Sequence, residues 1–187
     1  MKKIISLFQR NHGGDELVRN EIVPGAEWVV AGEGVATRKW DGTCCLIHNG
    51  QFYKRYEINP RKNHPVPTGF IQAQEPDPIT GKTVGWIPVG EGTNDQWHRE
   101  GFDASLPNGT YELCGPKVQG NVEHLTVHRL IPHGADVIDD APREFESLQS
   151  WFIGKDIEGI VWHHPDGRMV KMKKKDFGLT RTPHTSE

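Results

Sequence analysis

Long apolar runs are missing from this chain. Hydrophobic residues make up 35% of its 187 residues, and the mean hydropathy is −0.63. No segment approaches the ~20 apolar residues that a membrane helix requires. The apolar stretch after Lys2 and Lys3 is interrupted at Ser6 and ends at Gln9, which is too short for the apolar region of a signal peptide. We therefore expect a soluble, intracellular (cytoplasmic) protein without a membrane partner.

Cysteine is also scarce, with three residues in the whole chain. This number does not suggest a disulfide framework and fits a reducing compartment. Cys44 and Cys45 are adjacent, and neighbouring residues of a strand face opposite sides, so these two thiols do not easily share a tetrahedral zinc ion. The same objection applies to His163 and His164. We interpret all three cysteines, Cys114 included, as small buried residues.

An excess of positive charge is missing as well, because 22 Lys and Arg face 25 Asp and Glu and the net charge is −3. A nucleic-acid partner would therefore have to be bound by a local basic surface. The length predicts one compact domain, which we place at 1–178, followed by a polar tail at 179–187. Within the domain, 59–108 is rich in Pro, Gly and Asp and is predicted to be a long, partly ordered loop region.

A β-hairpin is the strongest local prediction. Thr43–His48 and Gln51–Tyr56 are strand-like runs on either side of Asn49-Gly50, the favoured pair for a two-residue type I′ turn. Further strands are expected at Glu27–Val30, Gly109–Leu113, Thr126–Leu130, Gly159–His163 and Met169–Lys173. Short helices are expected at Asp15–Glu21 and Pro142–Phe152. Alternating strands with few helices and no βαβ rhythm predict an α+β domain of mostly antiparallel sheets.

The most informative motif is Lys39-Trp-Asp-Gly42, in which a lysine precedes an Asp-Gly turn. A lysine amine is a poor nucleophile at neutral pH, since its ordinary pKa is ~10.4. Partial burial and nearby cations lower that pKa by disfavouring the ammonium form. Lys39 is therefore a candidate nucleophile if other cations lie close to it.

Three charged clusters follow this motif along the chain. Lys171 and Lys173 are two residues apart, so in a strand both amines face one side and can stabilise the charge of a phosphate. Glu112 and Glu158 adjoin predicted strands, where a carboxylate can accept hydrogen bonds from ribose hydroxyls or bind a divalent ion. This set of residues fits attack on a nucleoside triphosphate.

In this order the motifs resemble those of the covalent nucleotidyltransferases, the superfamily of DNA ligases, RNA ligases and mRNA capping enzymes. Lys39-Trp-Asp-Gly42 resembles motif I, and Arg55 lies where motif Ia places its arginine. Motifs III, IV and V are similar to Tyr111-Glu-Leu113, Glu158-Gly-Ile-Val161 and Val170-Lys-Met-Lys173. A lone Lys-x-Asp-Gly is most often a solvated turn, whereas five motifs in order are specific.

Two longer strings narrow the resemblance to one branch. The runs 39–45 (KWDGTCC) and 109–121 (GTYELCGPKVQGN) resemble those of the RNA ligase 1 family. That family has the adenylylation domain of the superfamily without an appended OB-fold. The resemblance therefore implies a nucleotidyltransferase fold with no OB-fold, and the end of this chain soon after motif V agrees with that expectation.

The resemblance also implies an activity, that of an ATP-dependent RNA ligase using Mg²⁺ or Mn²⁺. Lys39 would attack ATP to form lysyl-AMP, the AMP would pass to an RNA 5′-phosphate, and an RNA 3′-hydroxyl would displace it. Glu158 would organise the metal ion. The partner is RNA with 5′-phosphate and 3′-hydroxyl ends, and no obligate protein partner is evident.

Five further residues receive nucleotide-binding roles by the same resemblance. Arg55 and Glu112 would contact the ribose or the 5′-phosphate, and Asp41 would form a hydrogen bond within the nucleotide pocket. Lys171 and Lys173 would bind the phosphates.

Two alternatives stay open from the sequence. One is a degenerate nucleotidyltransferase domain that binds nucleotide or RNA without ligating, although such a domain has no need of a nucleophilic lysine. The other is a guanylyltransferase. Arg38 stands where several RNA ligases have Glu, and Thr43 stands where many relatives have Ser or Arg, so the choice of ATP over GTP rests on the family resemblance.

Overall fold

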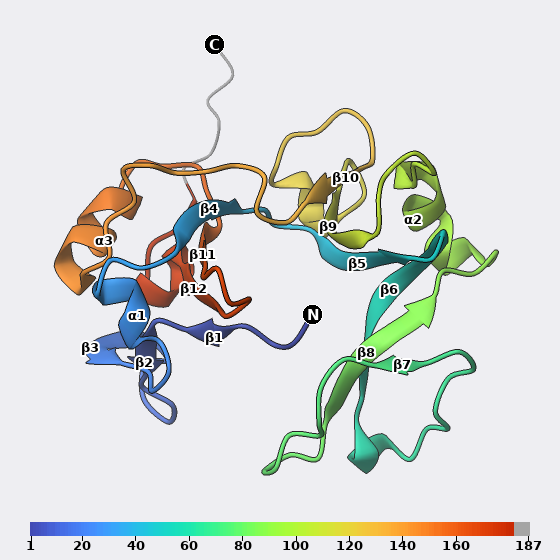
Figure 1. The fold of residues 1–187 in the computed structure, drawn as a ribbon, viewed down its shortest axis with the longest axis horizontal. Helices are drawn as coiled ribbons and strands as arrows, with labels where there is room; N and C mark the ends of the chain where they lie inside the picture. The colour runs from blue at the N-terminus through green and yellow to red at the C-terminus, as the bar shows by residue number, and fades with distance from the viewer. Residues whose placement is uncertain (182–187) are drawn as a thin grey trace. The chain divides into compact units, whose positions relative to one another are not determined.

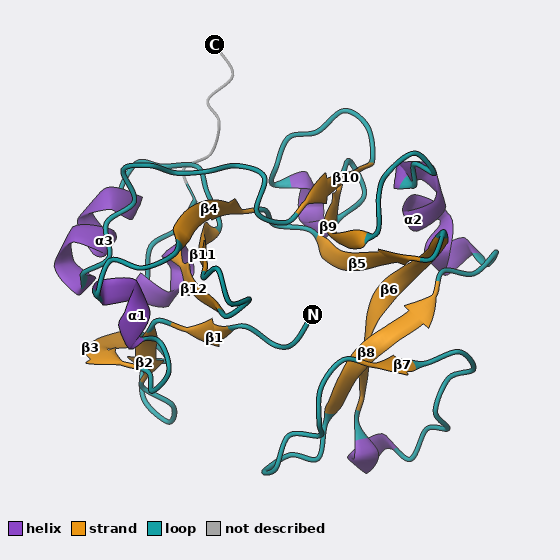
Figure 2. Ribbon diagram, viewed as in Figure 1, coloured by secondary structure: helices purple, strands orange, loops and turns teal. Residues whose placement is uncertain are grey.

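The computed structural model describes residues 1–181, and its contacts divide the chain into two compact units. Unit 1 contains 1–3 and 41–133, and unit 2 contains 4–40 and the described residues from 134 onward. Strands dominate and the helices are few and short, so the predicted α+β class with mostly antiparallel sheets is confirmed (Figures 1 and 2). No helix among residues 1–181 is both long and apolar enough to cross a membrane.

Unit 2 is built on a four-stranded sheet with the order β1-β12-β11-β4. Its strands are β1 (Ile5–Ser6), β4 (Val35–Lys39), β11 (Gly159–His163) and β12 (Met169–Lys173). β1 pairs with β12 in parallel, and the other pairs are antiparallel. The unit also contains the small sheet of β2 (Phe8–Arg10) and β3 (Val18–Ile22), and the helices α1 (Glu27–Val30), α3 (Phe145–Phe152) and η4 (Lys174–Phe177).

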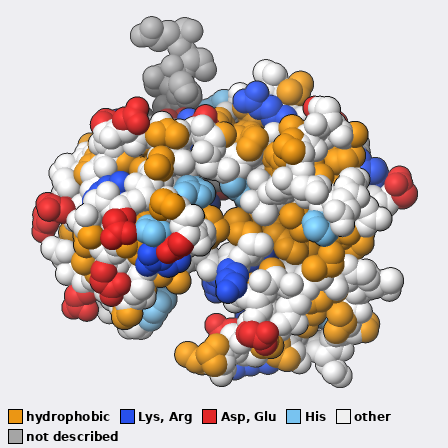
Figure 3. All heavy atoms as spheres, viewed as in Figure 1, with side chains coloured by type: hydrophobic (Ala, Val, Ile, Leu, Met, Phe, Trp, Pro, Cys, Tyr) orange, Lys and Arg blue, Asp and Glu red, His pale blue; other side chains and the backbone are white. Residues whose placement is uncertain are grey.

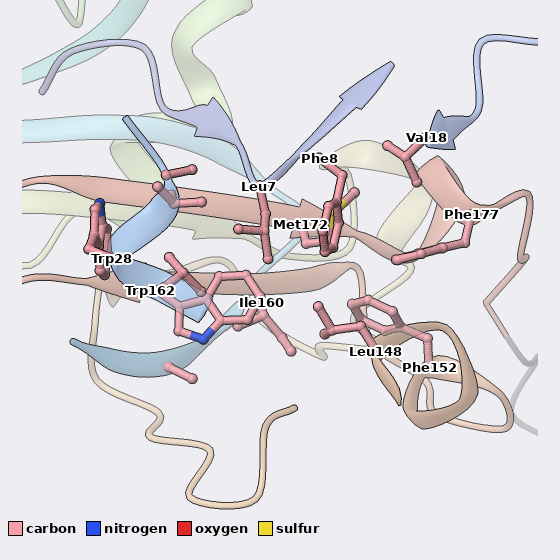
Figure 4. Close-up of a cluster of buried hydrophobic side chains, with 14 of the residues drawn as sticks. Leu7, Phe8, Val18, Trp28, Leu148, Phe152, Ile160, Trp162, Met172 and Phe177 are labelled. Atoms are coloured by element: carbon pink, nitrogen blue, oxygen red, sulfur yellow. The ribbon is translucent and has the colours of Figure 1, made fainter. Parts of the chain in front are cut away.

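The core of unit 2 lies between this sheet and its helices. Trp162, Ile160 and Met172 come from β11 and β12 and are fully buried, and Leu148 and Phe152 reach the same cluster from α3 (Figure 4). Burial of large side chains of this kind stabilises a fold by ~1.5–3 kcal/mol each. The strands that carry the predicted charged motifs are therefore anchored by their alternate, inward-facing residues.

Unit 1 is built on a six-stranded antiparallel sheet with the order β10-β9-β5-β6-β8-β7. Its strands are β5 (Thr43–His48), β6 (Gln51–Ile58), β7 (Ile71–Gln72), β8 (Thr83–Pro88), β9 (Gly109–Cys114) and β10 (Arg129–Pro132). The helical segments are η1 (Pro60–Lys62), η2 (Thr93–Asp95), α2 (Gln96–Gly101) and η3 (Gln119–Asn121). The buried hydrophobic cluster of this unit is small and consists of Cys45, Ile47, Tyr111, Leu113, Val118 and Leu130.

The predicted hairpin is confirmed, because β5 and β6 pair in antiparallel register around Asn49 and Gly50. Both turn residues have positive φ, +50° and +74°, as a type I′ turn requires. β9, β11 and β12 also form where the sequence predicts them, apart from one extra residue, Cys114, at the end of β9. The predicted strand 126–130 is shifted to Arg129–Pro132, and the predicted helix 142–152 begins at Phe145.

Two sequence predictions are wrong. Glu27–Val30, predicted as a strand, is helix α1, and its Trp28 and Val29 are buried in the core of unit 2. A run of this length does not distinguish strand from helix by periodicity alone. Asp15–Glu21, predicted as a helix, overlaps strand β3, because the Asp15 carboxylate accepts the Leu17 N–H at 3.1 Å and closes a turn instead of capping a helix.

The segment 59–108, predicted as a partly ordered loop region, contains β7, β8 and α2 in addition to loops. Trp86 of β8 is buried, so part of this segment belongs to the interior of unit 1. Of the predicted tail 179–187, residues 182–187 lie outside the described residues. Arg181 binds the Asp156 carboxylate through its Nε at 2.8 Å.

Candidate active-site clusters

The first cluster lies in unit 2 and brings together residues from three strands. In the register of the sheet, Gly159 at the start of β11 is opposite both Lys39 on β4 and Lys173 on β12. Glu158 precedes Gly159, and its carboxylate receives both lysines. Lys39 Nζ lies 2.6 Å from Glu158 Oε2, and Lys173 Nζ lies 2.9 Å from Oε1.

The glycine after Glu158 is required by close packing. A Cβ at Gly159 would lie 2.3 Å from the Met172 carbonyl oxygen and 3.0 Å from the Lys173 Cα. Only glycine lets the backbone of β11 approach β12 at this point. The Glu-Gly pair of the sequence thus holds the carboxylate beside the two lysines, and all three side chains are largely buried, with exposed fractions of 10–22%.

Lys171 completes this group, which we call the lysine cluster (Lys39, Glu158, Lys171 and Lys173). Its side chain is half-buried, and burial together with the charges of Lys173 and Lys39 lowers the pKa of its ammonium to about 8. The backbone is held by β1, since the Leu7 N–H donates to the Lys171 carbonyl at 2.9 Å. The cluster therefore concentrates three lysines around one carboxylate, which suits a polyanionic ligand.

The charges of the lysine cluster also determine how a divalent metal ion could bind there. Asp176 is a further carboxylate nearby, but it pairs with Arg10 and accepts the Lys173 N–H at 3.3 Å. Three ammonium groups beside Glu158 repel a bare divalent cation. Mg²⁺ is usually bound by one or two carboxylates together with phosphate oxygens, so the donor set fits an ion that arrives with a triphosphate.

The second cluster lies in unit 1 and is centred on Glu112 of β9. Its Oε1 accepts the Gly42 N–H at 3.2 Å, and its Oε2 lies 2.8 Å from Nε2 of His133. The other ring nitrogen of His133, Nδ1, lies 3.0 Å from the Thr110 hydroxyl. Cys44 is directly opposite Glu112 in the β5–β9 pair. We call Cys44, Glu112 and His133 the mixed cluster.

Asp41 and Gly42 lie at the start of the segment 41–133 of unit 1, next to this cluster. The Asp41 N–H donates to Glu123 Oε1 at 2.8 Å. A Cβ at Gly42 would lie 2.2 Å from the Leu113 carbonyl oxygen. The glycine of the Lys-x-Asp-Gly motif is therefore fixed by close approach to β9, and its N–H orients the Glu112 carboxylate.

Arg55 of β6 lies on the same face of the sheet as Cys44. Lys54 is opposite Cys45, so these two side chains share one face. Because side chains alternate along a strand, Arg55, which follows Lys54, and Cys44, which precedes Cys45, share the other face. The Arg55 guanidinium donates to the Met1 carbonyl at 2.6 Å and lies over the Trp86 ring, 4.8 Å from its centroid. Burial lowers the pKa of Arg55 from its ordinary value.

The seven residues predicted for the site thus fall into two groups. Unit 2 brings together Lys39, Glu158, Lys171 and Lys173, and unit 1 carries Asp41, Arg55 and Glu112. On the face drawn in Figure 3, acidic and basic side chains lie interspersed, in keeping with the small net charge of the chain.

Sequence reasoning missed His133, Glu123 and Asp136 as neighbours of the motifs. His133 directly follows β10, which was predicted to end at residue 130 and ends at Pro132. A correct prediction of this strand end would have placed His133 beside Glu112. Asp136 accepts the indole N–H of Trp40 at 2.7 Å. Glu123 and Asp136 lie in loops, where no periodicity indicates their direction.

Comparisons with known proteins agree with the motifs. The sequence model of a family described as RNA ligase 1 matches residues 103–186. RNA ligase 1 of Rattus norvegicus and of Mus musculus are each 29% identical over a gapped alignment 219 positions long, which covers 78% of this chain and 67% of the relative. RNA ligase 1 of Danio rerio is 30% identical over an alignment of 220 positions, which covers 77% of this chain and 67% of the relative. The chain therefore belongs to the RNA ligase 1 family.

Proposed function

We propose that this chain is an ATP-dependent RNA ligase and that Lys39 is its nucleophile. The observation that carries the proposal is the lysine cluster, in which the Lys39 amine is held 2.6 Å from Glu158 and two further lysines lie on β12, the strand beside β11. Membership in the RNA ligase 1 family supports a ligase that acts on RNA. Five motifs in order along the chain support the same chemistry.

The first step transfers AMP to Lys39. The neutral amine nitrogen attacks the α-phosphorus of ATP and a P–N bond forms. The bond from the α-phosphorus to its bridging oxygen breaks, and pyrophosphate leaves with the electron pair. The ammonium form has no lone pair, so Lys39 must first lose a proton, and Glu158 Oε2 lies in position to accept it.

Lys171 and Lys173 stabilise the negative charge that develops on the phosphate oxygens. They come from one strand and face the same side, so both can contact one phosphate group. Removal of a single preorganised donor of this kind costs about 10²–10³ in rate. Mg²⁺ or Mn²⁺ bound at Glu158 would neutralise phosphate charge when it enters with the nucleotide.

Two further steps complete the reaction. An oxygen of the RNA 5′-phosphate attacks the phosphorus of lysyl-AMP, the P–N bond breaks, and the lysine recovers its amine. The 3′-hydroxyl of a second RNA end then attacks the 5′-phosphorus, a phosphodiester forms, and AMP leaves. In this scheme Glu112 and Arg55 contact the ribose or the 5′-phosphate, and Asp41 forms a hydrogen bond within the nucleotide pocket.

The proposal extends to the fold. We assign residues 1–178 to one nucleotidyltransferase domain without an OB-fold. Strands that carry motifs I, IV and V in one sheet of unit 2 support this assignment.

The experiment that tests the activity is covalent labelling. The chain is incubated with Mg²⁺ and α-labelled ATP or GTP and separated on a denaturing gel. We expect label from ATP that is absent in Lys39→Ala and retained in Lys155→Ala, a lysine of unit 2 whose ammonium lies over the Trp151 ring. Label from GTP alone favours a guanylyltransferase, and no label from either nucleotide favours a binding domain.

A second experiment tests the substrate. We expect sealing of a 5′-phosphate to an RNA 3′-hydroxyl to be faster than sealing to a DNA 3′-hydroxyl. RNA binding should weaken with salt, because basic side chains replace counterions on the phosphate backbone. Equal rates on RNA and DNA ends would contradict the assignment to RNA.

A further inference from the structure

The mixed cluster has a geometry that nucleotide binding by Glu112 does not require. Its three side chains come from adjacent strands, since Cys44 on β5 is opposite Glu112 on β9. His133 follows β10, and its N–H donates to the carbonyl of Thr110, two residues before Glu112, at 3.2 Å. The alternation of side chains places all three on one face of the sheet. The thiol sulfur, a carboxylate oxygen and a ring nitrogen all lie within 4.8 Å of one another.

We propose that Cys44, Glu112 and His133 form a Zn²⁺ site. A thiolate, an imidazole and a carboxylate are the three ligand types that Zn²⁺ takes in proteins, at ~2.3, ~2.0–2.1 and ~2.0–2.2 Å. Small rotations of the side chains bring the three donor atoms to these distances. Mg²⁺ prefers oxygen ligands, so a thiolate and an imidazole together select against it. Three protein ligands leave a fourth position for water or a substrate oxygen.

The surroundings of the cluster orient its ligands. The His133 ring is held at Nδ1 by the Thr110 hydroxyl, 3.0 Å away, and this hydroxyl can accept as well as donate. It therefore supports the tautomer that carries the proton on Nδ1 and presents the Nε2 lone pair to an ion. Glu112 is held at Oε1 by the Gly42 N–H, and its other oxygen lies toward His133. Zinc ligands commonly have such second partners.

The other two cysteines are unsuited to this role. Cys45 is fully buried on the opposite face of β5, and Cys114 is buried as well. Cys44 is the cysteine whose sulfur lies within 4.8 Å of the Glu112 and His133 donor atoms. It is therefore the cysteine that the site uses, and Cys45 provides a matched control.

A consequence for activity rests on the proposed function. If Glu112 contacts the nucleotide ribose or the RNA 5′-phosphate, Zn²⁺ at the mixed cluster removes that carboxylate from the substrate. Zinc then inhibits ligation even in the presence of saturating Mg²⁺. The lysine cluster lacks a thiol and an imidazole, so this inhibition depends on Cys44 and His133.

The binding test uses Co²⁺ as a spectroscopic probe on the full chain, without an affinity tag, thiol reductant or nucleotide. We expect one Co²⁺ per chain, a thiolate-to-cobalt absorption band and visible bands typical of four-coordinate Co²⁺, with competition by Zn²⁺. The thiolate band should persist in Cys45→Ala and disappear in Cys44→Ala. His133→Ala should weaken binding strongly, and Thr110→Val by about 10–100-fold.

Circular dichroism of each variant checks that it is folded. If Cys44→Ala unfolds, Co²⁺ binding by His133→Ala and Thr110→Val still tests the site, because both variants keep the Cys44 thiol. Unchanged binding by both would overturn the site. A wild-type chain with no thiolate band, or a band that persists in Cys44→Ala, overturns the site. This readout needs no nucleotide, so it is independent of the proposed ligase activity.

The activity test compares each protein with and without Zn²⁺ in the labelling assay. We expect Zn²⁺ to lower labelling of the wild type by up to about tenfold more than labelling of Cys44→Ala, each relative to its own zinc-free rate, because loss of the Glu112 contact is expected to cost about this much. Equal inhibition of both overturns the competitive role. A chain that binds Co²⁺ as expected but never labels would contradict the proposed ligase activity and leave the metal site standing.

Discussion

The two units differ in how much apolar surface supports their polar clusters. Among residues 1–181, the buried hydrophobic cluster of unit 2 has 15 members, including two tryptophans and three phenylalanines, and the corresponding cluster of unit 1 has six. The four-stranded sheet of unit 2 is packed against α1, α3 and η4, as Figure 4 shows for its large side chains. The larger sheet of unit 1 has fewer deeply buried residues for its size.

The variety of side chains in the polar clusters follows the opposite order, because the unit with the smaller core has the more varied cluster. The lysine cluster of unit 2 has one kind of cation around one carboxylate and suits phosphate groups. The mixed cluster of unit 1 combines a thiol, a carboxylate and an imidazole, with the Arg55 guanidinium on the same face of the sheet. The unit with the larger core thus has a site built from two types of charged side chain, and the unit with the smaller core has a site built from several types of side chain. The predictions below test this contrast.

The largest effect is expected from truncating the cores. Trp162→Ala in unit 2 should lower the free energy of unfolding by about 3–5 kcal/mol, and Leu113→Ala in unit 1 by about 2–5 kcal/mol. Because the cluster around Trp162 is larger, its variant should be the less stable of the two. Urea unfolding followed by circular dichroism measures both. A greater loss for Leu113→Ala would show that unit 1 depends more on burial than the sizes of the clusters indicate.

The next effect concerns the two glutamates. Glu158→Gln should lower the rate of labelling by ATP about 100-fold, since misplacement of a reacting group costs rates of this order. Glu112→Gln should lower it about tenfold, because the proposal gives Glu112 a binding contact that does not touch the nucleophile. Single-turnover labelling at saturating ATP measures both variants. A larger loss of rate for Glu112→Gln would contradict the proposal that Glu158 acts beside the nucleophile and Glu112 only binds the nucleotide.

Substitution of a turn glycine should cost the same stability in both units. Gly50 and Gly167 have φ of +74° and +92°, and a Cβ at either would meet nothing within 4 Å. Each change to Ala should cost about 1–2 kcal/mol from backbone strain alone. Gly92 has φ of −67° and equally open surroundings, so Gly92→Ala is the matched control and should leave stability nearly unchanged. Thermal unfolding distinguishes the three variants.

The smallest effect is a dependence on pH at Lys171. Its pKa of about 8 in the folded chain lies below the ordinary 10.5, so between these values the unfolded chain binds more protons and wild-type stability rises with pH. Below pH 8 both states are charged and the full cost of burial applies.

Lys171→Met should therefore stabilise the chain at pH 7, by less than about 1 kcal/mol because solvent screens the half-buried ammonium. This advantage should shrink as pH rises from 8 toward 10.5. Urea unfolding at several pH values, with Lys155→Met as the control, measures it. An advantage that grows with pH would contradict the lowered pKa.

Local signals in the sequence predicted most of the strands that carry the motifs. Asn49-Gly50 defines its hairpin without tertiary help, because both residues readily adopt positive φ. The Val-Lys-Met-Lys alternation defines β12, with Val170 and Met172 fully buried and Lys171 and Lys173 only partly buried. Spacing along one strand also predicted that Lys171 and Lys173 face the same side.

Contacts between distant segments could not be predicted in this way. The pairing of Lys39 with Glu158 spans 119 residues and depends on the order of strands in the sheet. His133 reaches Glu112 only because β10 lies beside β9. Helix α1 was mistaken for a strand because burial of Trp28 and Val29 satisfies either structure, and only the packing of unit 2 decides between them.

The chain order of unit 2 has a consequence for synthesis on the ribosome. Its sheet pairs β1 with β12, so β1 lacks this partner strand until residue 171 has emerged. The segment 41–133, by contrast, is continuous and can fold as soon as it is complete. A chain that stops after residue 133 would thus contain a finished mixed cluster but no lysine cluster, because Glu158, Lys171 and Lys173 would still be missing.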